Sequence, residues 1–170
     1  MLLILLMYAA LLGVPFWAVA VVVKLVSALL PGRRPDWARD LLRWSAAMTA
    51  VAAVMVYAIG LGSVEWDASE AESGAGSSPA APCRSLPPGT LGLLAGHEPS
   101  YFPLGFDCLL TDGRVVAGTG PYDLLNGLGI AFALAAVLLT LSVGFLDEYR
   151  ARAALRTGRA GRVDEPQETG

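Results

Sequence analysis

Apolar residues gather in three long runs, which cover residues 2–23, 44–64 and 126–146. Each run has about 20 residues, and a helix of that length, rising about 1.5 Å per residue, crosses a hydrocarbon core of about 30 Å. None of the runs has a charged residue between its ends. The pattern therefore predicts an all-α transmembrane protein, a three-helix bundle whose spans are residues 1–30, 44–64 and 125–146.

The polar segments that separate the runs differ in charge. Arginines lie mainly in the short segment 31–43 and in the tail 147–170, whereas the long segment 65–124 has two arginines and eight acidic residues. Lysine and arginine beside membrane spans favour the cytoplasmic side. We therefore expect a multi-pass protein of the cell membrane, with its N-terminus and residues 65–124 outside and with segment 31–43 and the tail in the cytoplasm.

A cleaved signal peptide is the alternative interpretation of the first run. The sequence Ala18-Val19-Ala20 is typical of a cleavage site. However, no basic residue precedes the run, and residues 21–23 continue it past the site, which favours an uncleaved helix.

Small residues recur at every fourth position in the second and third runs. Such faces let two helix backbones approach closely, so the second and third helices are expected to pack on each other through them. The residues concerned are Ser45, Thr49 and Ala53 in the second run and Gly127, Ala131 and Ala135 in the third.

The long segment 65–124 is expected to contain a flexible linker and a β-hairpin. Residues 68–82 are rich in Ser, Gly, Ala, Glu and Pro, which is typical of a linker, and residues 158–170 have the composition of a disordered tail. Residues 106–119 place Asp112-Gly113 between two strand-forming runs, which predicts a two-residue turn with positive φ at both positions. In that register Leu110 lies opposite Val115.

The same register places Cys108 opposite Ala117 and Phe106 opposite Thr119, so that one face of the hairpin is apolar. Its members would be Phe106, Cys108, Leu110, Val115 and Ala117.

Cys83 and Cys108 are the only cysteines, and both fall in the segment expected outside the cell. Disulfides form there, and a bridge between the two would stabilise the loop by about 3–4 kcal/mol in the chain-entropy model. A redox-active pair is the alternative, but the two lack the close Cys-x-x-Cys spacing that lowers a thiol pKa. The sequence therefore predicts a structural disulfide.

Residues 97–103 add turn formers and aromatic side chains, and they include the candidate interaction surface His97, Tyr101 and Phe102. Tyr101 and Phe102 are expected to cover the apolar face of the hairpin, with the membrane surface or a partner as alternatives. His97 with Glu98 would suit a metal site or an acid/base pair, but neither further ligands nor an oriented nucleophile accompany them. A solvated loop histidine is the favoured interpretation, and no metal or cofactor is expected.

The pattern Cys83, Tyr101-Phe102-Pro103, Cys108 and Asp112-Gly113 resembles the outer loop of small multi-pass membrane proteins of GC-rich bacteria. The resemblance spans residues 83–113. It implies the disulfide and the topology, and it implies no activity.

The sequence favours a structural or interaction protein, or an accessory subunit, over an enzyme. Paired carboxylates, nucleophile motifs and phosphate-binding glycine loops are missing from the sequence. The runs hold few polar side chains, which speaks against transport and leaves an oligomeric channel or transporter component as the alternative. Expected partners are the lipid bilayer and a membrane protein or a second copy. Nucleic acid is not expected, because topology alone accounts for the arginines.

Overall fold

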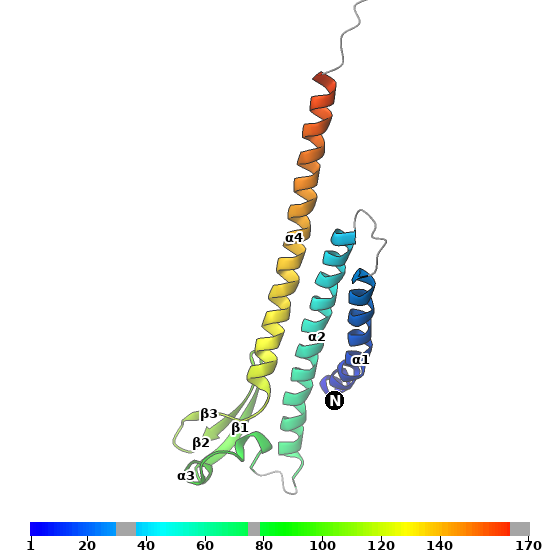
Figure 1. The fold of residues 1–170 in the computed structure, drawn as a ribbon. Coiled ribbons are helices and arrows are strands. Elements are labelled where there is room, and N and C mark those ends of the chain that lie inside the picture. Colours follow the sequence, from blue (N-terminus) through cyan, green and yellow to red (C-terminus); the bar gives the residue numbers. More distant parts are fainter. Residues whose placement is uncertain (30–36, 75–78, 164–170) are drawn as a thin grey trace, which may run out of the picture.

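The computed structural model describes residues 1–29, 37–74 and 79–163 and shows a mostly helical protein with a small sheet at one end (Figure 1). The long helices are α1 (Leu2–Leu29), α2 (Trp37–Glu72) and α4 (Tyr122–Val163). Between α2 and α4 lie η1 (Ala81–Cys83), α3 (Pro88–Leu91), β1 (Leu94–Tyr101), β2 (Leu104–Leu110) and β3 (Val115–Ala117).

The three long helices are each long and apolar enough to cross a membrane, as predicted. Two of them extend further than the apolar runs. Helix α2 continues through residues 68–72, which were predicted as linker, and α4 continues through residues 158–163, which were predicted as disordered tail. Adding a residue to an existing helix requires no new nucleus, and the alanines and glutamates after residue 64 are good helix formers. Helix α2 stops just before Gly74, whose φ of 94° suits the left-handed end of a helix.

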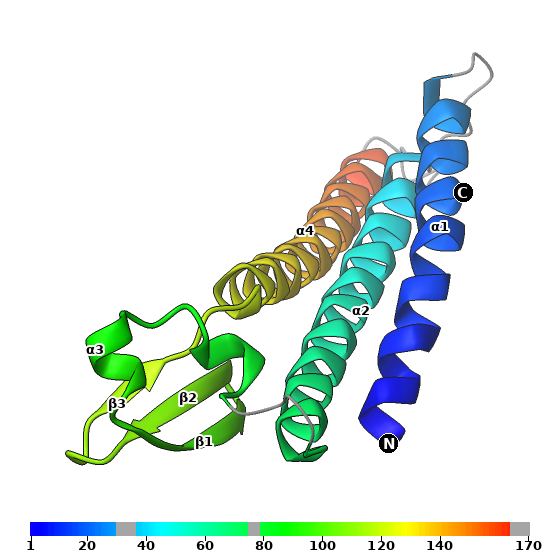
Figure 2. The ribbon, with the colours of Figure 1, turned by 90° about the horizontal axis from the view of Figure 1, so that it is seen from below.

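The helices form a row in which α2 lies between α1 and α4 and packs against both (Figures 1 and 2). The arrangement is therefore more open than the predicted bundle. Against α1, the indole Nε1 of Trp17 donates to the carbonyl oxygen of Met48 at 3.1 Å. Gly62 permits a close approach here, because a Cβ at this position would lie 2.2 Å from the Cβ of Met7.

The predicted small-residue contact between α2 and α4 is only partly correct. The two helices pack on each other, but Gly127 faces open space and Ala131 is exposed. On α2, the residues that line the space toward α4 include Ala46 and Ala50, which are not among the predicted ones. A four-residue spacing of small residues identifies a possible face but does not say which neighbour occupies it.

Polar contacts join neighbouring helices near both ends of the apolar region. Lys24 of α1 contacts Asp40 of α2 at 2.8 Å, and Arg39 of α2 contacts Asp147 of α4 at 2.6 Å. At the opposite end, the hydroxyl of Tyr122 donates to Asp67. Tyr122 and Asp147 are about 38 Å apart along α4, close to the thickness of a bilayer with its headgroups. We call these two ends the arginine end and the sheet end.

The segment between α2 and α4 folds into a three-stranded antiparallel sheet with the order β1-β2-β3, where a two-stranded hairpin was predicted. Strand β1 was missed because Gly96 and Pro99 lie within it, and both residues are rare in strands. Strand β1 is at an edge, where a proline is tolerated. A two-residue connection, Phe102-Pro103 with a cis peptide bond, joins β1 to β2.

The predicted register of β2 and β3 is wrong by one residue. Cys108 pairs with Val116, and Leu109 pairs with Val115. The turn has three residues instead of two. In it, the Gly113 amide donates to the Leu110 carbonyl oxygen, and only Gly113 has a positive φ. A turn of this kind adds one residue to the loop and shifts the pairing, so that Val115 is 58% exposed.

The buried core lies between one face of the sheet and the sheet end of α2 and α4. Strand β2 supplies three of its residues, because the residues of this strand alternate between buried and half-buried along its whole length. The fully assembled core consists of Val64, Ala80, Cys83, Leu104, Phe106, Cys108 and Tyr122. We call residues 79–121 the sheet domain; the helices α2 and α4 contribute Val64 and Tyr122 to its core.

Candidate functional site

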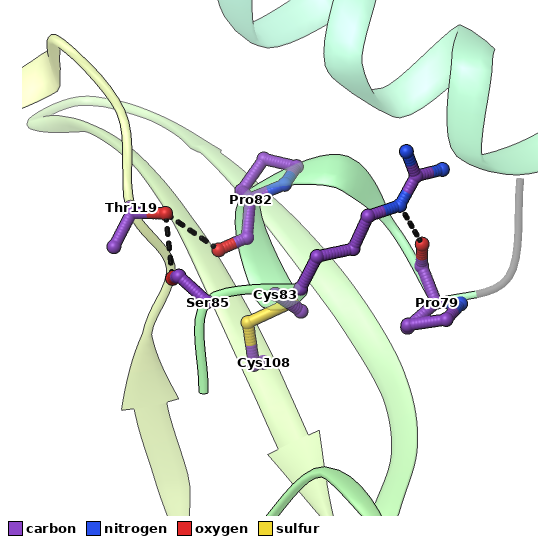
Figure 3. Close-up of a disulfide and its surroundings, with 7 residues drawn as sticks. Pro79, Pro82, Cys83, Ser85, Cys108 and Thr119 are labelled. Carbon is purple, nitrogen blue, oxygen red and sulfur yellow. Dashed lines mark hydrogen bonds between the residues drawn. A yellow bond between two sulfur atoms is a disulfide. The ribbon is translucent and has the colours of Figure 1, made fainter. Parts of the chain in front are cut away.

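The two cysteines form the predicted disulfide, which joins η1 to the middle of β2 (Figure 3). Their Cα atoms are 5.9 Å apart, and both residues are fully buried. Thr119 supports the same region, because its amide and its hydroxyl both donate to the carbonyl oxygen of Pro82, at 2.8 and 3.1 Å. The Ser85 and Thr119 hydroxyls lie 2.8 Å apart. The bridge is a structural element of the sheet domain.

Asn126, in the first turns of α4, holds the start of β2. Its amide Nδ2 donates to the carbonyl oxygen of Leu104 at 2.8 Å, and its Oδ1 accepts from the Leu104 amide at 3.1 Å. The side chain thus pairs with the strand as another strand would. Leu104 also packs on Gly60 of α2. A Cβ added at Gly60 would lie 2.2 Å from Cδ1 of Leu104. The start of β2 therefore lies between α2 and α4.

Tyr122 makes a second link between the sheet domain and the helices. It is part of the core, and its hydroxyl donates to the carboxylate of Asp67. Burial raises the pKa of the Tyr122 phenol well above its ordinary value, and the hydrogen bond to Asp67 raises this pKa further. The phenol therefore stays neutral and keeps its proton available for the bond.

His97 lies on β1 and not in a loop as predicted. Its ring stacks on Phe106, with the ring centroids 5.2 Å apart, so His97 helps to cover the core. Glu98 is the next residue of the same strand, and successive strand residues point to opposite faces. The two side chains therefore do not form an acid/base pair or a shared metal site.

Tyr101 and Phe102 lie at the tip of the sheet domain that reaches back along α2. The hydroxyl of Tyr57 donates to the Tyr101 carbonyl oxygen at 2.8 Å, and the Tyr101 hydroxyl donates to Glu65 at 3.0 Å. Phe102 is 87% exposed. The expectation that Phe102 covers the apolar face is therefore wrong, since that face is already filled by the helix ends. We call Tyr101 and Phe102 the aromatic tip.

The part of the chain that the structure describes holds no group of three or more histidine, cysteine or acidic residues that could bind a metal ion. A small pocket of about 240 Å³ lies between β2, β3 and the start of α4, and two carboxylates, Asp107 and Asp123, line it. Two carboxylates without further ligands do not make a metal centre.

Little in the sequence indicated which residues attach the sheet domain to the helices. Asn126 stands at the edge of an apolar run, where it reads as an interfacial residue, and Gly60 reads as one of many small residues. Their role depends on the position of Leu104, more than 20 residues from Asn126 and more than 40 from Gly60. Only the tertiary arrangement brings the three together.

Comparisons of the chain with family models, with curated proteins and with solved structures find no match. The resemblance of residues 83–113 to the outer loops of small bacterial membrane proteins therefore stays a prediction.

Proposed function

We propose that this chain is a membrane-anchored interaction protein, an accessory subunit whose three spans present the sheet domain outside the cell to another membrane protein. The orientation follows from the arginines, which favour the cytoplasmic side for segment 31–43 and the tail. The acidic segment with the disulfide then lies in the compartment where disulfides persist.

The aromatic tip is the observation that carries this proposal. Phe102 is 87% exposed although it is large and apolar, while the sheet behind it is fixed by the disulfide and by Asn126. Exposed aromatic side chains on a rigid support are typical of the centres of protein interfaces. Because the aromatic tip is already ordered, little conformational entropy is lost when a partner binds, and this suits a recognition surface.

The depth of the aromatic tip indicates what kind of partner it meets. Tyr57, which holds Tyr101, precedes Glu65 by eight residues, or about 12 Å along α2. Tyr57 belongs to the apolar run 44–64, so the tip lies beside the outer part of the membrane. A partner that reaches it must itself lie in the membrane or at its surface.

Polar side chains in the spans support interaction over transport. The hydroxyls of Thr49, Thr140 and Ser142 each donate to a carbonyl oxygen of their own helix, three or four residues earlier. Such hydroxyls are satisfied within the helix and do not need a water-filled path. An oligomeric channel or transporter component is the alternative.

The orientation is tested by labelling with a membrane-impermeant thiol reagent. Because both native cysteines are bridged, the variants Arg34→Cys, Gly76→Cys and Gly161→Cys each add the only reactive thiol. We expect labelling of intact cells at position 76 alone. Labelling at position 34 or 161 would contradict the orientation.

The function is tested by placing a photo-crosslinking amino acid at position 102 in cells that express the chain natively. We expect a discrete adduct with another membrane protein, and its loss when Cys83 and Cys108 are both replaced by serine. Position 115 is the matched control, because Val115 is also exposed but lies on the far strand. Equal adducts from both positions, or lipid adducts alone, would contradict the proposal. An adduct of two copies, with ion flux in liposomes, would favour the channel.

A further inference from the structure

A groove runs between α2 and α4 at the arginine end. Its volume is about 760 Å³, within the range of small-molecule sites. Alanines form much of its lining, including Ala46, Ala50 and Ala136. Because these side chains are short, the two helices touch without filling the space between them.

The groove extends over only half of the membrane. Its lining starts at Asp147 and ends at Ala136, which are 11 residues and about 16 Å apart along α4. One leaflet of the hydrocarbon core is about 15 Å thick. A helix that crosses the bilayer would need a stripe about twice as long, whereas a lipid acyl chain needs one leaflet.

The mouth of the groove is positively charged. Arg39 and Arg43 both reach the same oxygen of Asp147, at 2.6 and 3.4 Å. Two guanidinium groups thus share one carboxylate, and the longer contact belongs to Arg43, whose side chain is 57% exposed. Basic groups at the membrane surface between spans attract anionic lipid headgroups, and guanidinium binds phosphate well.

We propose that this groove binds one anionic phospholipid, with an acyl chain along Ala50 and Ala136 and the phosphate beside Arg43. The apolar lining, the depth of one leaflet and the excess of positive charge at the mouth suit the two parts of such a lipid. The proposal does not depend on the partner of the aromatic tip.

The test reconstitutes the full chain in vesicles of equal parts phosphatidylglycerol and phosphatidylcholine, extracts it in mild detergent and counts retained lipids by native mass spectrometry. We expect one retained phosphatidylglycerol, favoured over phosphatidylcholine by at least about fivefold, the effect of one basic residue near a membrane surface. Arg43→Gln should abolish this preference. Ala50→Phe should abolish retention, because the added ring occupies the groove.

Arg152→Gln is the matched control, since Arg152 is an exposed arginine of α4 that pairs with Glu148 on its own helix. It should leave both retention and preference unchanged. Equal retention of the two lipids, or loss of preference in Arg152→Gln as well, would overturn the proposal. A dimer that disappears in Ala50→Phe would also overturn it, because a second copy would then occupy the groove. Intact Cys83–Cys108 bridging in each variant shows that it has folded.

Discussion

Replacing Asn126 with leucine should loosen the sheet domain from α2 and α4. Leucine has the same number of side-chain heavy atoms as asparagine and the same branching at Cγ, so the change removes the two hydrogen bonds to Leu104 without leaving a cavity. Each such bond contributes about 1 kcal/mol, and leaving both backbone groups of Leu104 without partners brings the cost to about 2–4 kcal/mol. The open state of the sheet domain should then be populated about 30- to 1,000-fold more.

The rate at which a phosphine reductant cleaves the disulfide measures this opening. Both cysteines are fully buried, so the reagent reaches them only when the domain opens. In detergent, the reduction of Asn126→Leu should be faster than that of the unaltered chain by the factor above. Asn126→Asp keeps an acceptor for the Leu104 amide but loses the donor, and it should lie between the two.

Ser142→Ala is the control for this experiment, because its hydroxyl bonds only within α4 and lies far from the sheet. It should be reduced at the rate of the unaltered chain. If Asn126→Leu were also reduced at that rate, to within a factor of about three, Asn126 would not hold the sheet domain, and the attachment would have to come from apolar packing alone.

Three further changes test the sheet domain and its surroundings. Replacing Cys83 and Cys108 together by serine should destabilise the domain by about 3–4 kcal/mol, seen as rapid limited proteolysis within residues 79–121; unchanged resistance would refute this. Gly118→Ala places a Cβ 2.8 Å from a backbone oxygen and should lower the unfolding temperature, at a cost of about 1–3 kcal/mol in stability. Gly127→Ala is the control, because its Cβ meets open space and should leave the unfolding temperature unchanged or slightly raised. A similar fall of the unfolding temperature in both variants would contradict the packing. Burial, and then the hydrogen bond to an α2 carboxylate, raise the pKa of the Tyr122 phenol. The stability that the neutral phenol gives the fold is therefore complete below the ordinary pKa of 10.0 and is lost as the pH rises through the folded-state pKa. In an absorbance titration of the tyrosines, Tyr122→Phe should remove one group that titrates above the ordinary pKa of tyrosine.

The long helices could be predicted from the sequence because a lipid-spanning helix has a simple requirement, an uninterrupted apolar run. Their ends could not be predicted as well. Helix α2 continues to Glu72 and α4 to Val163, since a helix already formed extends through any residues that tolerate it, polar or not. Hydropathy indicates which residues are apolar enough to lie in a membrane, and it says little about where the backbone hydrogen bonds of a helix end.

The sheet domain was predicted less completely, for two physical reasons. Gly113 marked the turn correctly, but its neighbour Asp112 keeps a negative φ, and a loop one residue longer changed every pair. Strand β1 is stabilised by pairing with β2 and not by its own composition, so residues such as Pro99 hide it. The disulfide could be predicted because the sequence has only two cysteines, which leaves a single possible pairing.

Helix α4 is a single element of 42 residues, held by the sheet domain near one end and continuing beyond Asp147 for about 24 Å at the other. A rigid helix of this length has the geometry of a lever. If a partner rocks the sheet domain by 10°, a rigid arm of about 55 Å from Asn126 to Val163 swings its far tip through about 10 Å. In the orientation proposed above, a small displacement at the sheet end would thus become a large one at the opposite end of α4, with no channel and no chemical messenger in between.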